Sequence, residues 1–553
     1  MEAAGEKGVA RIKPEFVIQA EEQPQTPQKE EQSEEPASKK PKREERKRGQ
    51  NKARGVPWKA DPGTQVCVSL IDVREGEPWP ECERGAKCNH MHSARDYLAL
   101  KPADLGSTCY LYSTFGRCPR GLACRFGSSH ITEEGHNKVD PELFDPDRPA
   151  SSTNVLSKEV QLALRKYKYD FSKSEKVCKG EKRQGPVADE DQVKLKAEEK
   201  PKIEWRDKLY LSPLTTLGNL PFRRVCRRFG ADVTCGEMAV ASSILQGQPQ
   251  EWALVRRHES ETLFGAQICG NNPLILAKCA QVLQEQTDIH FVDINTGCPI
   301  DLIYQQGSGS ALMRRPNVLE QMVTAMTQVS DLPVTVKTRT GVYSDKKTAH
   351  TLIPRLRTSG ASLITLHGRS REQRYTKMAD WAYIDECAKA AHPVPLFGNG
   401  DILSYEDYKE KREMCPNVAG VMIGRGALMK PWIFTEIKEQ RQWDISSSER
   451  LEILKQYVNF GLEHWGSDDK GVETCRRFLL EWLSFLYRYV PLGLLERPPQ
   501  AINERPPPFR GRDDLETLMA SPRSADWVAI SELLLGPVPQ HFHFLPKHKA
   551  NAY

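Results

Sequence analysis

Eight short apolar runs, each rich in strand-forming residues, alternate with amphipathic stretches between Trp205 and Ala427, and this alternation limits the fold more than any other feature. The runs are Leu209–Ser212, Val233–Cys235, Leu263–Ile268, His290–Asn295, Val334–Thr338, Leu363–His367, Val394–Phe397 and Gly420–Ile423. Stretches of helical period lie between most of them, for example Pro273–Gln286, Val318–Val329, Ala349–Thr358, Trp381–Ala391 and Tyr405–Met414. Repeated strand–helix units of this kind build a parallel sheet. Eight of them predict an α/β fold, a (β/α)8 TIM barrel, over residues 203–440.

Polar and glycine-rich segments end nearly every run. They are Ser212-Pro213-Leu214-Thr215, Gln267, Asn295-Thr296-Gly297-Cys298-Pro299, Lys337, His367-Gly368-Arg369, Gly398-Asn399-Gly400-Asp401 and Gly424-Arg425-Gly426. In a TIM barrel the carboxyl ends of the strands surround the active site, so these segments would meet at one mouth. An open, doubly wound sheet explains the alternation equally well, but it explains neither the number of runs nor their polar ends.

Composition divides the chain ahead of the barrel. Residues 1–57 are rich in Glu, Gln, Lys and Pro with almost no aromatics, which predicts a disordered tail. A basic run within it, residues 39–48, suits a nuclear import receptor or a phosphate backbone, or is simply a solvated charge run. Residues 64–132 hold a cluster of cysteines, and residues 133–202 are predicted to form a linker.

After the barrel, residues 441–553 are predicted to form a helical domain that binds RNA. The segments Ser448–Trp465 and Val472–Tyr489 have a helical period, with aromatic residues three and four positions apart. Such a stripe is more often a core face than a binding surface. Basic residues there, such as Arg476 and Arg477, could contact phosphates.

The cysteines indicate metal sites rather than disulfides. No apolar run of 18 residues exists, and Met1 to Arg11 lacks the apolar stretch of a secretory signal. We therefore expect a protein inside the cell, in the nucleus and cytoplasm, with no membrane contact and no obligate protein partner. In a reducing compartment, fifteen cysteines do not favour a disulfide framework, and clusters among them are better explained as metal ligands.

Two sets of three cysteines and one histidine follow one another in this segment. The first is Cys67, Cys82, Cys88 and His92, separated by 14, 5 and 3 residues, and the second is Cys109, Cys118, Cys124 and His130, separated by 8, 5 and 5. Three thiolates and an imidazole brought together by loops of this size predict two structural Zn²⁺ sites. His90 is a weaker competitor for the first site.

The two sets resemble CCCH zinc fingers, a family that commonly binds single-stranded RNA. The final gap in that family is usually three residues, which makes His130 a less certain ligand than His92. Aromatic and basic residues of the second set would stack on bases and attract phosphates. They are Tyr110, Tyr112, Phe115, Arg117, Arg120, Arg125 and Phe126. A purely structural finger is the alternative.

Glycine-centred turns after the last two runs indicate a phosphate site. Glycines in Gly398–Asp401 and Gly424–Gly426 let backbone N–H groups approach an anion, and Arg425 adds charge. No Gly-x-Gly-x-x-Gly stands between a strand and a helix, which favours a mononucleotide such as FMN, although a sugar phosphate would fit as well. Cys298 lies in a sharp turn that would aim its thiol into the mouth. The alternative is an inert buried cysteine.

Taken in order, the barrel motifs resemble those of the tRNA-dihydrouridine synthases. They are Ser212-Pro213-Leu214-Thr215, Asn295–Pro299, Val336-Lys337-Thr338-Arg339-Thr340-Gly341, Thr365-Leu366-His367-Gly368-Arg369, Gly398–Asp401 and Gly424–Gly426. With two CCCH fingers ahead of the barrel, the chain is most similar to the eukaryotic branch whose target is position 47 in the tRNA variable loop. The resemblance implies FMN-dependent reduction of uridine to 5,6-dihydrouridine in tRNA, with NADPH or NADH as reductant. It leaves open whether mRNA is also a substrate.

The resemblance also implies roles for single residues. Cofactor contacts would be made by Pro213, Leu214, Thr215, Gln267, Lys337, His367, Asn399, Gly400, Asp401, Gly424 and Arg425. Gln267 would pair with the flavin pyrimidine edge, Lys337 would offset charge near N1, and Arg425 would hold the phosphate. After hydride transfer from flavin N5 to uracil C6, Cys298 would protonate C5, because a thiol with a pKa of about 8.5 is protonated at neutral pH. Gln267 or His367 could instead merely complete a layer of the barrel.

Two other functions fit part of the pattern. An RNA-binding regulator with an inactive barrel would be colourless, whereas the enzyme would purify yellow. A barrel flavoenzyme acting on a small pyrimidine would use free uracil nucleotides as readily as tRNA. On tRNA the target base must leave its stack, at a cost of a few kcal/mol, and basic surface on the fingers and helical domain would supply binding energy.

Overall fold

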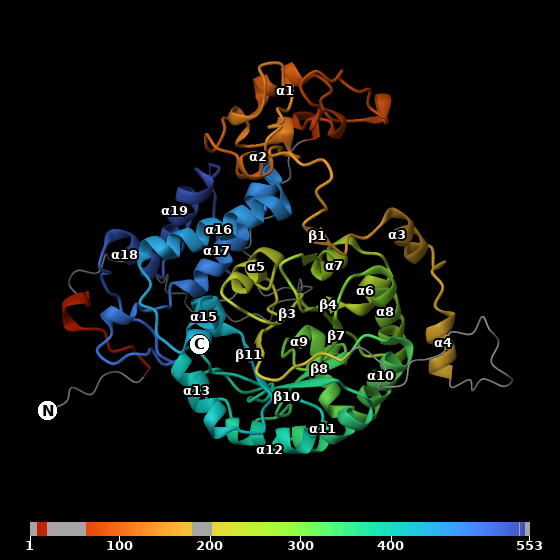
Figure 1. Cartoon of the computed structure of the whole chain (residues 1–553), viewed down its shortest axis with the longest axis vertical. Coiled ribbons are helices and arrows are strands. Elements are labelled where there is room, and N and C mark those ends of the chain that lie inside the picture. The colour runs from red at the N-terminus through yellow and green to blue at the C-terminus, as the bar shows by residue number, and fades with distance from the viewer. Residues whose placement is uncertain (1–7, 19–61, 180–201, 541, 548–553) are drawn as a thin grey trace, which may run out of the picture.

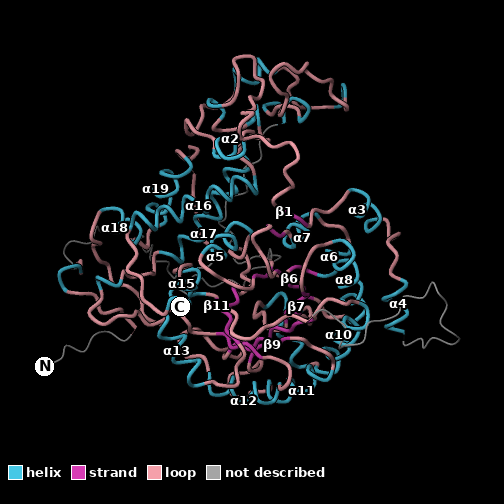
Figure 2. Tube along the Cα trace, in the orientation of Figure 1, coloured by secondary structure: helices cyan, strands magenta, loops and turns pink. Residues whose placement is uncertain are grey.

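Eight parallel strands form a ring with helices around it (Figures 1 and 2). The computed structural model describes residues 8–18, 62–179, 202–540 and 542–547. The ring consists of β2 (Leu209–Leu211), β3 (Thr234–Cys235), β6 (Phe264–Cys269), β7 (Phe291–Asn295), β8 (Val334–Arg339), β9 (Leu363–His367), β10 (Leu396–Asn399) and β11 (Gly420–Ile423). In the described part of the chain, no helix is both long enough and apolar enough to cross a bilayer.

The order of the strands closes the sheet on itself. Neighbours run β2-β11-β10-β9-β8-β7-β6-β3, and a parallel bridge between Tyr210 and Val233 joins the two ends. The Leu211 N–H donates to the Val233 carbonyl at 2.9 Å across the same seam. The predicted barrel is therefore confirmed and the open sheet is wrong. Strand β10 begins later than the predicted Val394, because Pro395 has no N–H for the ladder.

The helices that surround the ring are those of the predicted units, with several short additions. They are α5 (Leu220–Arg228), α6 (Ala241–Leu245), α7 (Pro249–Trp252), α8 (Pro273–Gln286), α9 (Asp301–Gln305), α10 (Pro316–Val329), α11 (Ala349–Thr358), α12 (Trp381–Ala391), α13 (Tyr405–Met414), α14 (Arg425–Met429) and α15 (Ile433–Glu439). Side-chain caps begin several of them: Asn272 accepts from the Ile275 N–H at the start of α8, and Ser404 forms a capping box with Asp407 at α13. Two short pairings were not predicted: β4 (Ala239–Val240) on β6, and β1 (Ser152–Thr153) with β5 (Arg257–His258).

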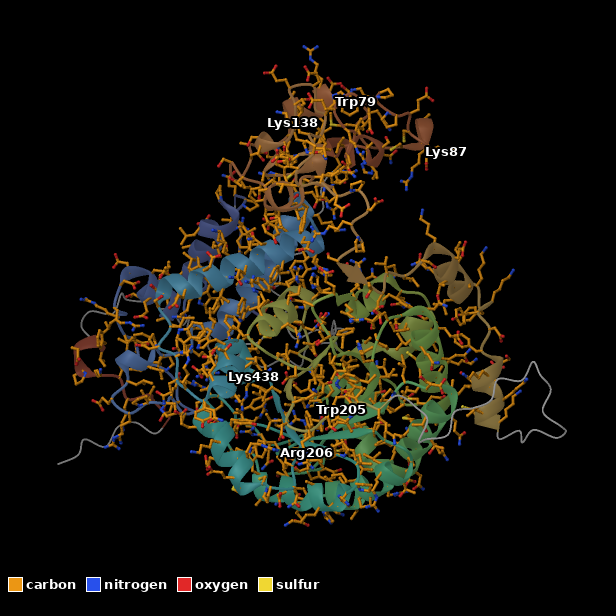
Figure 3. All side chains as sticks on the ribbon, in the orientation of Figure 1. Trp79, Lys87, Lys138, Trp205, Arg206 and Lys438 are labelled. Carbon is orange, nitrogen blue, oxygen red and sulfur yellow. The ribbon has the colours of Figure 1, made fainter. Side chains whose placement is uncertain are left out.

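Four aromatic rings fill the end of the barrel where the strands begin. Trp205, Tyr210, Phe291 and Phe397 are buried and meet edge to face, with ring centroids 5.4 to 6.3 Å apart. Figure 3 shows Trp205 within the ring of helices. Gly265 makes room for this layer, because a Cβ there would overlap the Phe291 ring. The barrel is thus closed at its amino end and can receive a ligand only at the other.

The C-terminal region is helical, as predicted. Its long helices α16 (Ser447–Trp465) and α17 (Asp469–Leu486) pack against each other, followed by α18 (Asp514–Ala520) and α19 (Ser524–Leu535). A capping box between Ser446 and Glu449 starts α16, and the Asp468 side chain caps α17. The Trp482 indole N–H donates to the Leu428 carbonyl at 2.9 Å, which ties α17 to the barrel.

Residues 64–132, the finger module, lie at the tip of α16 (Figure 1). The module contains α1 (Ala94–Leu100), α2 (Tyr110–Phe115) and several single 3-10 turns. Its own small core includes Val66, Leu70, Tyr97 and Leu122. A core of this size gives little stability alone, as expected for a unit held by metal ligands.

Part of the predicted disordered tail has a defined place. Residues 8–18 lie along the C-terminal region, where the Ala10 N–H donates to the Arg505 carbonyl at 2.8 Å and Ile12 pairs with Leu495. Ala10 and Ile12 are buried in this contact. Average composition conceals this short apolar segment, so the tail prediction is wrong for it. The remainder of 1–57, including the basic run 39–48, lies outside the described residues.

The predicted linker also contacts the barrel over much of its length. It contains α3 (Lys158–Arg165) and α4 (Ser172–Lys179), and α4 lies against α8. The Ser174 hydroxyl donates to Gln281 at 2.6 Å, and Lys278 pairs with Glu175 at 2.6 Å. These polar contacts hold a lysine-rich segment that has little apolar surface to bury.

Candidate functional site

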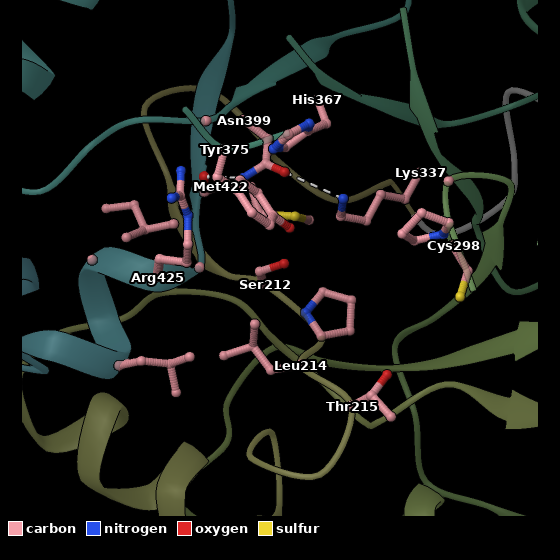
Figure 4. A pocket seen from close by; sticks show the side chains of 18 of the residues that line it. Ser212, Leu214, Thr215, Cys298, Lys337, His367, Tyr375, Asn399, Met422 and Arg425 are labelled. Carbon is pink, nitrogen blue, oxygen red and sulfur yellow. Dashed lines mark hydrogen bonds between the residues drawn. The ribbon is translucent and has the colours of Figure 1, made fainter. Parts of the chain in front are cut away.

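One cavity of about 400 Å³ opens at the carboxyl ends of the barrel strands, within the size range of small-molecule sites (Figure 4). Every residue predicted for catalysis or cofactor binding lines it: Pro213, Leu214, Thr215, Gln267, Cys298, Lys337, His367, Asn399, Gly400, Asp401, Gly424 and Arg425. These residues come from seven of the eight strands or the loops after them. The closed barrel therefore brings together side chains spread over more than 200 positions of sequence.

Cys298 is held by the turn that follows β7. The Asn295 side-chain oxygen accepts the N–H groups of Gly297 at 3.1 Å and Cys298 at 2.9 Å. The Asn295 amide in turn donates to Gln267 at 2.8 Å, so the turn is fixed to β6. Burial raises the pKa of the Cys298 thiol above its usual value, although Arg339 and Lys337 pull it down in part. The sulfur is therefore a protonated thiol at neutral pH, suited to act as an acid.

Lys337 projects from β8 into the same cavity. Its ammonium group donates to the Asn399 side-chain oxygen at 3.2 Å, as the dashed line in Figure 4 marks. The Asn399 amide donates to the Met422 carbonyl at 2.7 Å, which fixes the orientation of that acceptor. Burial, together with the nearby Arg339, lowers the pKa of Lys337 to about 8. An anionic ligand would relieve this cost and restore the charge.

His367 and Arg339 form the wall between β8 and β9. The Arg339 guanidinium donates to the Gly297 carbonyl at 2.7 Å and the Ser370 carbonyl at 3.1 Å, and it lies 3.3 Å from His367 Nδ1. Burial and four neighbouring cations hold the pKa of His367 well below its usual value. The ring is thus neutral. With Nδ1 accepting from Arg339, its proton is on Nε2, which can donate.

Arg425 stands on the side of the cavity away from Cys298 (Figure 4), and Asp401 is its ion-pair partner. The buried Asp401 carboxylate accepts from Arg369 at 2.6 and 2.7 Å, from Arg425 at 2.8 Å and from the Ala379 N–H at 2.7 Å. All of its strong acceptor positions are used within the chain. Asp401 therefore positions Arg425, and the two guanidinium groups leave this end of the cavity with a net positive charge.

Sequence reasoning did not select two further lining residues, Arg339 and Tyr375. Arg339 lies inside a recognised motif, two positions after Lys337 and on the same face of β8, and this spacing was a usable signal. Tyr375 lies in the loop after β9 with no motif around it, and the Arg425 guanidinium lies 4.1 Å from its ring centre. Only the folded chain could reveal that contact.

The ligand atoms of each cysteine–histidine set lie within 4.8 Å of one another. The first set comprises Cys67, Cys82, Cys88 and His92, and the second Cys109, Cys118, Cys124 and His130. In the second set His130 Nδ1 contacts the Asn137 side-chain oxygen at 3.0 Å, while Nε2 is buried without a hydrogen-bond partner among the described residues. A hydrogen-bonded Nδ1 with a free Nε2 is the usual state of a metal-binding histidine. Each donor set fits a tetrahedral Zn²⁺ ion, and His130 belongs to the second.

The aromatic and basic residues of the second set contact other parts of the same chain. Tyr110, Tyr112 and Phe115 pack against the main core, and Phe126 is buried within it. Arg117, Arg120 and Arg125 pair with Asp72, Asp468 and Asp469 respectively. These side chains therefore have internal contacts, and an RNA-binding face on the second set stays a prediction. Arg476 is likewise fully buried, donating to Ser531 at 3.0 Å, and cannot contact phosphate.

Comparison with known proteins identifies the family. The profile described as "Dihydrouridine synthase (Dus)" matches residues 210–484. A human protein named "tRNA-dihydrouridine(47) synthase [NAD(P)(+)]-like" is 54% identical, with the match covering 92% of this chain and 85% of the relative. The chain belongs to the dihydrouridine synthase family. It is accordingly an oxidoreductase, as the resemblance of its motifs predicted.

Two further relatives match this dihydrouridine synthase over most of its length. A Xenopus laevis protein of the same name is 53% identical, over 92% of this chain and 83% of its own length. In Coprinopsis cinerea, "tRNA-dihydrouridine(47) synthase [NAD(P)(+)]" is 42% identical, over 85% of each chain. These matches are longer than the barrel alone and extend over most of the synthase.

Proposed function

We propose that this dihydrouridine synthase reduces uridine to 5,6-dihydrouridine at position 47 of tRNA, in the nucleus and cytoplasm. FMN would bind in the barrel mouth, and NADPH or NADH would be the reductant. Uridines of mRNA would be a second class of substrate. The observation that carries it is that the thiol of Cys298 and the cationic groups of Lys337 and Arg425 line one cavity. The printed names of the relatives support tRNA and position 47.

The cavity residues fit FMN. Lys337, whose pKa burial and the nearby Arg339 lower to about 8, would offset negative charge on the flavin ring, and Asn399 holds it in place. Arg425, oriented by Asp401, would bind the phosphate. The Gln267 amide, already fixed by Asp293 at 2.8 Å, would face the pyrimidine edge. Bound FMN supplies the hydride that C6 of uracil receives.

Cys298 would complete the reaction by protonating C5. The S–H bond breaks as the C5–H bond forms, and the electron pair left on sulfur makes a thiolate that solvent later protonates. Arg339 and Lys337 lower the cost of that negative charge, because both already stabilise the thiolate electrostatically. The Asn295 turn keeps the sulfur in position throughout the step.

The rim of the cavity favours an RNA over a small pyrimidine. Apolar side chains on loops at the carboxyl ends of β7, β8 and β9 are exposed, among them Ile300, Leu302, Tyr343 and Met378. A small substrate needs no such rim, whereas unstacked bases beside an extruded uridine would cover it. The Arg371 N–H donates to the Gly341 carbonyl at 3.0 Å, so two of these loops lie side by side.

The two cysteine–histidine sets would each hold a Zn²⁺ ion. Three thiolates and one imidazole match its preferred ligands, and the small core of the finger module needs the added stability. Zinc has no part in the reduction in this proposal.

The test is to purify the full chain, record its absorption spectrum and assay it with NADPH on tRNA and on free uridine nucleotides. We expect a yellow protein that forms dihydrouridine at position 47 in tRNA from cells lacking the enzyme, and much more slowly on nucleotides. Equal rates on both substrates would favour the small-pyrimidine enzyme. Colourless protein with no activity would contradict the assignment of FMN to this cavity.

A further inference from the structure

A serine of the helical domain contacts the second cysteine–histidine set. Ser467 lies in the short turn between α16 and α17, and its hydroxyl oxygen is 3.3 Å from the Cys118 sulfur. Both residues are buried, at 1% and 0% exposure, and they are 349 positions apart in sequence. A metal-bound thiolate only accepts hydrogen bonds, so with metal present the serine hydroxyl must be the donor.

Charged contacts surround this hydrogen bond on the same turn. The Arg125 N–H donates to the Ser467 carbonyl at 2.9 Å, and the Arg125 guanidinium pairs with Asp469. Arg120 donates to the Trp465 carbonyl at 3.2 Å and lies 3.6 Å from the Asp468 carboxylate. The arginines of the second set thus recognise the turn, and the turn presents two carboxylates to them.

Gly466 allows the turn to lie close to Arg120. Its φ of +108° lies in the region that favours glycine, and a Cβ at this position would overlap the Arg120 guanidinium. The turn sequence Gly466-Ser467-Asp468-Asp469 therefore combines a close approach, a hydroxyl donor and two anions against the second set.

The first set has a different environment. Its Cys67 sulfur accepts from Ser69 at 3.2 Å, a residue of the same loop only two positions away. His92 is exposed, and Cys82 and Cys88 are half-buried. Trp79, which belongs to this part of the module, lies on its side away from the barrel, and Lys87 lies at its outer edge (Figure 3).

We propose that the second metal site is the joint between the finger module and the helical domain, with Ser467 as its outer hydrogen-bond donor. The hydroxyl stabilises the thiolate of Cys118 and orients it toward the metal, as such partners do elsewhere. Loss of this metal frees the turn and releases the module from α16 and α17. The first set packs against Leu122, Ala123 and Ile131 inside the finger module, and its exposed side at His92 stays available to a substrate.

The test follows zinc release from the full, zinc-loaded chain into a chromogenic chelator. Two kinetic phases are expected, one for each set. Ser467→Ala should speed the slower phase about tenfold and leave the faster one unchanged, because loss of an outer partner typically lowers metal affinity by that factor or more. Ser69→Ala is the matched control and should affect only the faster phase. An equal rate of zinc release in the slower phase of the Ser467→Ala variant and of the parent would overturn the proposal.

Hydrogen exchange of the unmodified protein provides a second measurement that needs no variant. As the slower zinc is released, amides of the turn at residues 466–469 should lose protection together with α2, while the barrel strands keep theirs. An Asp469→Asn variant, which keeps the serine, should show the same loss at lower chelator concentration. A turn that stays protected after both zinc ions have left would show that packing alone forms the joint, and the proposal would fail.

Discussion

The amino ends of the barrel strands bury Trp205, Tyr210, Phe291 and Phe397 against one another, whereas the carboxyl ends of the same strands surround a cavity with thiol, ammonium and guanidinium groups. Only a few residues separate the two environments. In β10, Phe397 belongs to the aromatic layer, and Asn399, two positions later on the same face, holds Lys337.

Strand β7 shows how the change is made in steps. Its inward residues are Phe291 in the aromatic layer, Asp293 in the middle and Asn295 at the mouth. The Asp293 carboxylate accepts from Thr335 at 2.5 Å and from Gln267 at 2.8 Å. Burial raises its pKa, and these bonds lower it in part. One end of each strand therefore stabilises the fold, and the other end carries buried polar groups that are costly to bury.

The largest effect is expected at the closed end. Phe397→Ala removes a ring from the aromatic layer and leaves a cavity, so unfolding free energy should fall by about 3–5 kcal/mol. Urea titration measures this, and FMN content per folded molecule should not change. Asn399→Ala, two residues later, should instead weaken FMN binding with a smaller loss of stability. If both variants lost stability and FMN alike, the separation of the two ends would be wrong.

At the mouth, Cys298→Ala should lower the rate of uridine reduction by about a hundredfold or more, the usual contribution of a positioned acid. Reduction of bound FMN by NADPH should be unchanged, since that step needs no proton from the thiol. Stopped-flow measurement separates the two half-reactions. Cys178→Ala, on the exposed face of α4, is the control and should be without effect on either.

Lys337→Met should weaken FMN binding by about tenfold, the size expected for losing a charged hydrogen-bonding partner. The flavin-free protein should be no less stable than the parent, because an ammonium group that is unfavourable to bury is replaced by an apolar side chain. Fluorescence titration with FMN and a urea curve together measure both quantities. Unchanged FMN affinity would remove Lys337 from the cofactor site.

The last effect concerns pH. The pKa of Lys337 is lowered to about 8 in the folded flavin-free protein, while in the unfolded chain it is near its usual value of about 10.4. Between these values the unfolded state binds more protons, so this group makes stability rise with pH in that window. Urea midpoints of the parent and of Lys337→Met, compared from pH 7.5 to 10, measure this contribution of Lys337 to stability. The same difference after FMN binding should shrink.

Local pattern was enough to predict the barrel and most of its cavity. Strand-forming runs with polar ends specify both the ring and the side chains at its mouth, because a closed barrel leaves only one place for the carboxyl ends of its strands. Cys298, Lys337 and Arg425 were found in this way. Tyr375 was not, since a loop residue becomes part of a site only through the path that the folded loop takes.

The finger module shows what local composition leaves open. Arg120 and Arg125 have the composition of a nucleic-acid surface, but their partners are Asp468 and Asp469, more than 340 positions away. No local pattern distinguishes an arginine that meets phosphate from one that meets a carboxylate of its own chain. The defined structure of residues 8–18 was not predicted for a related reason, because their few apolar side chains gain a partner only in the C-terminal region.

That amino-terminal segment also has a bearing on the order of events during synthesis. Lys13 donates to the Gly493 carbonyl at 2.7 Å across 480 positions of sequence, so the pairing has to wait until Gly493 has left the ribosome. Ile502, within the region to which the segment binds, contributes to the cavity wall. This part of the cavity wall is thus secured late, after the strands that form the floor of the cavity have had time to assemble.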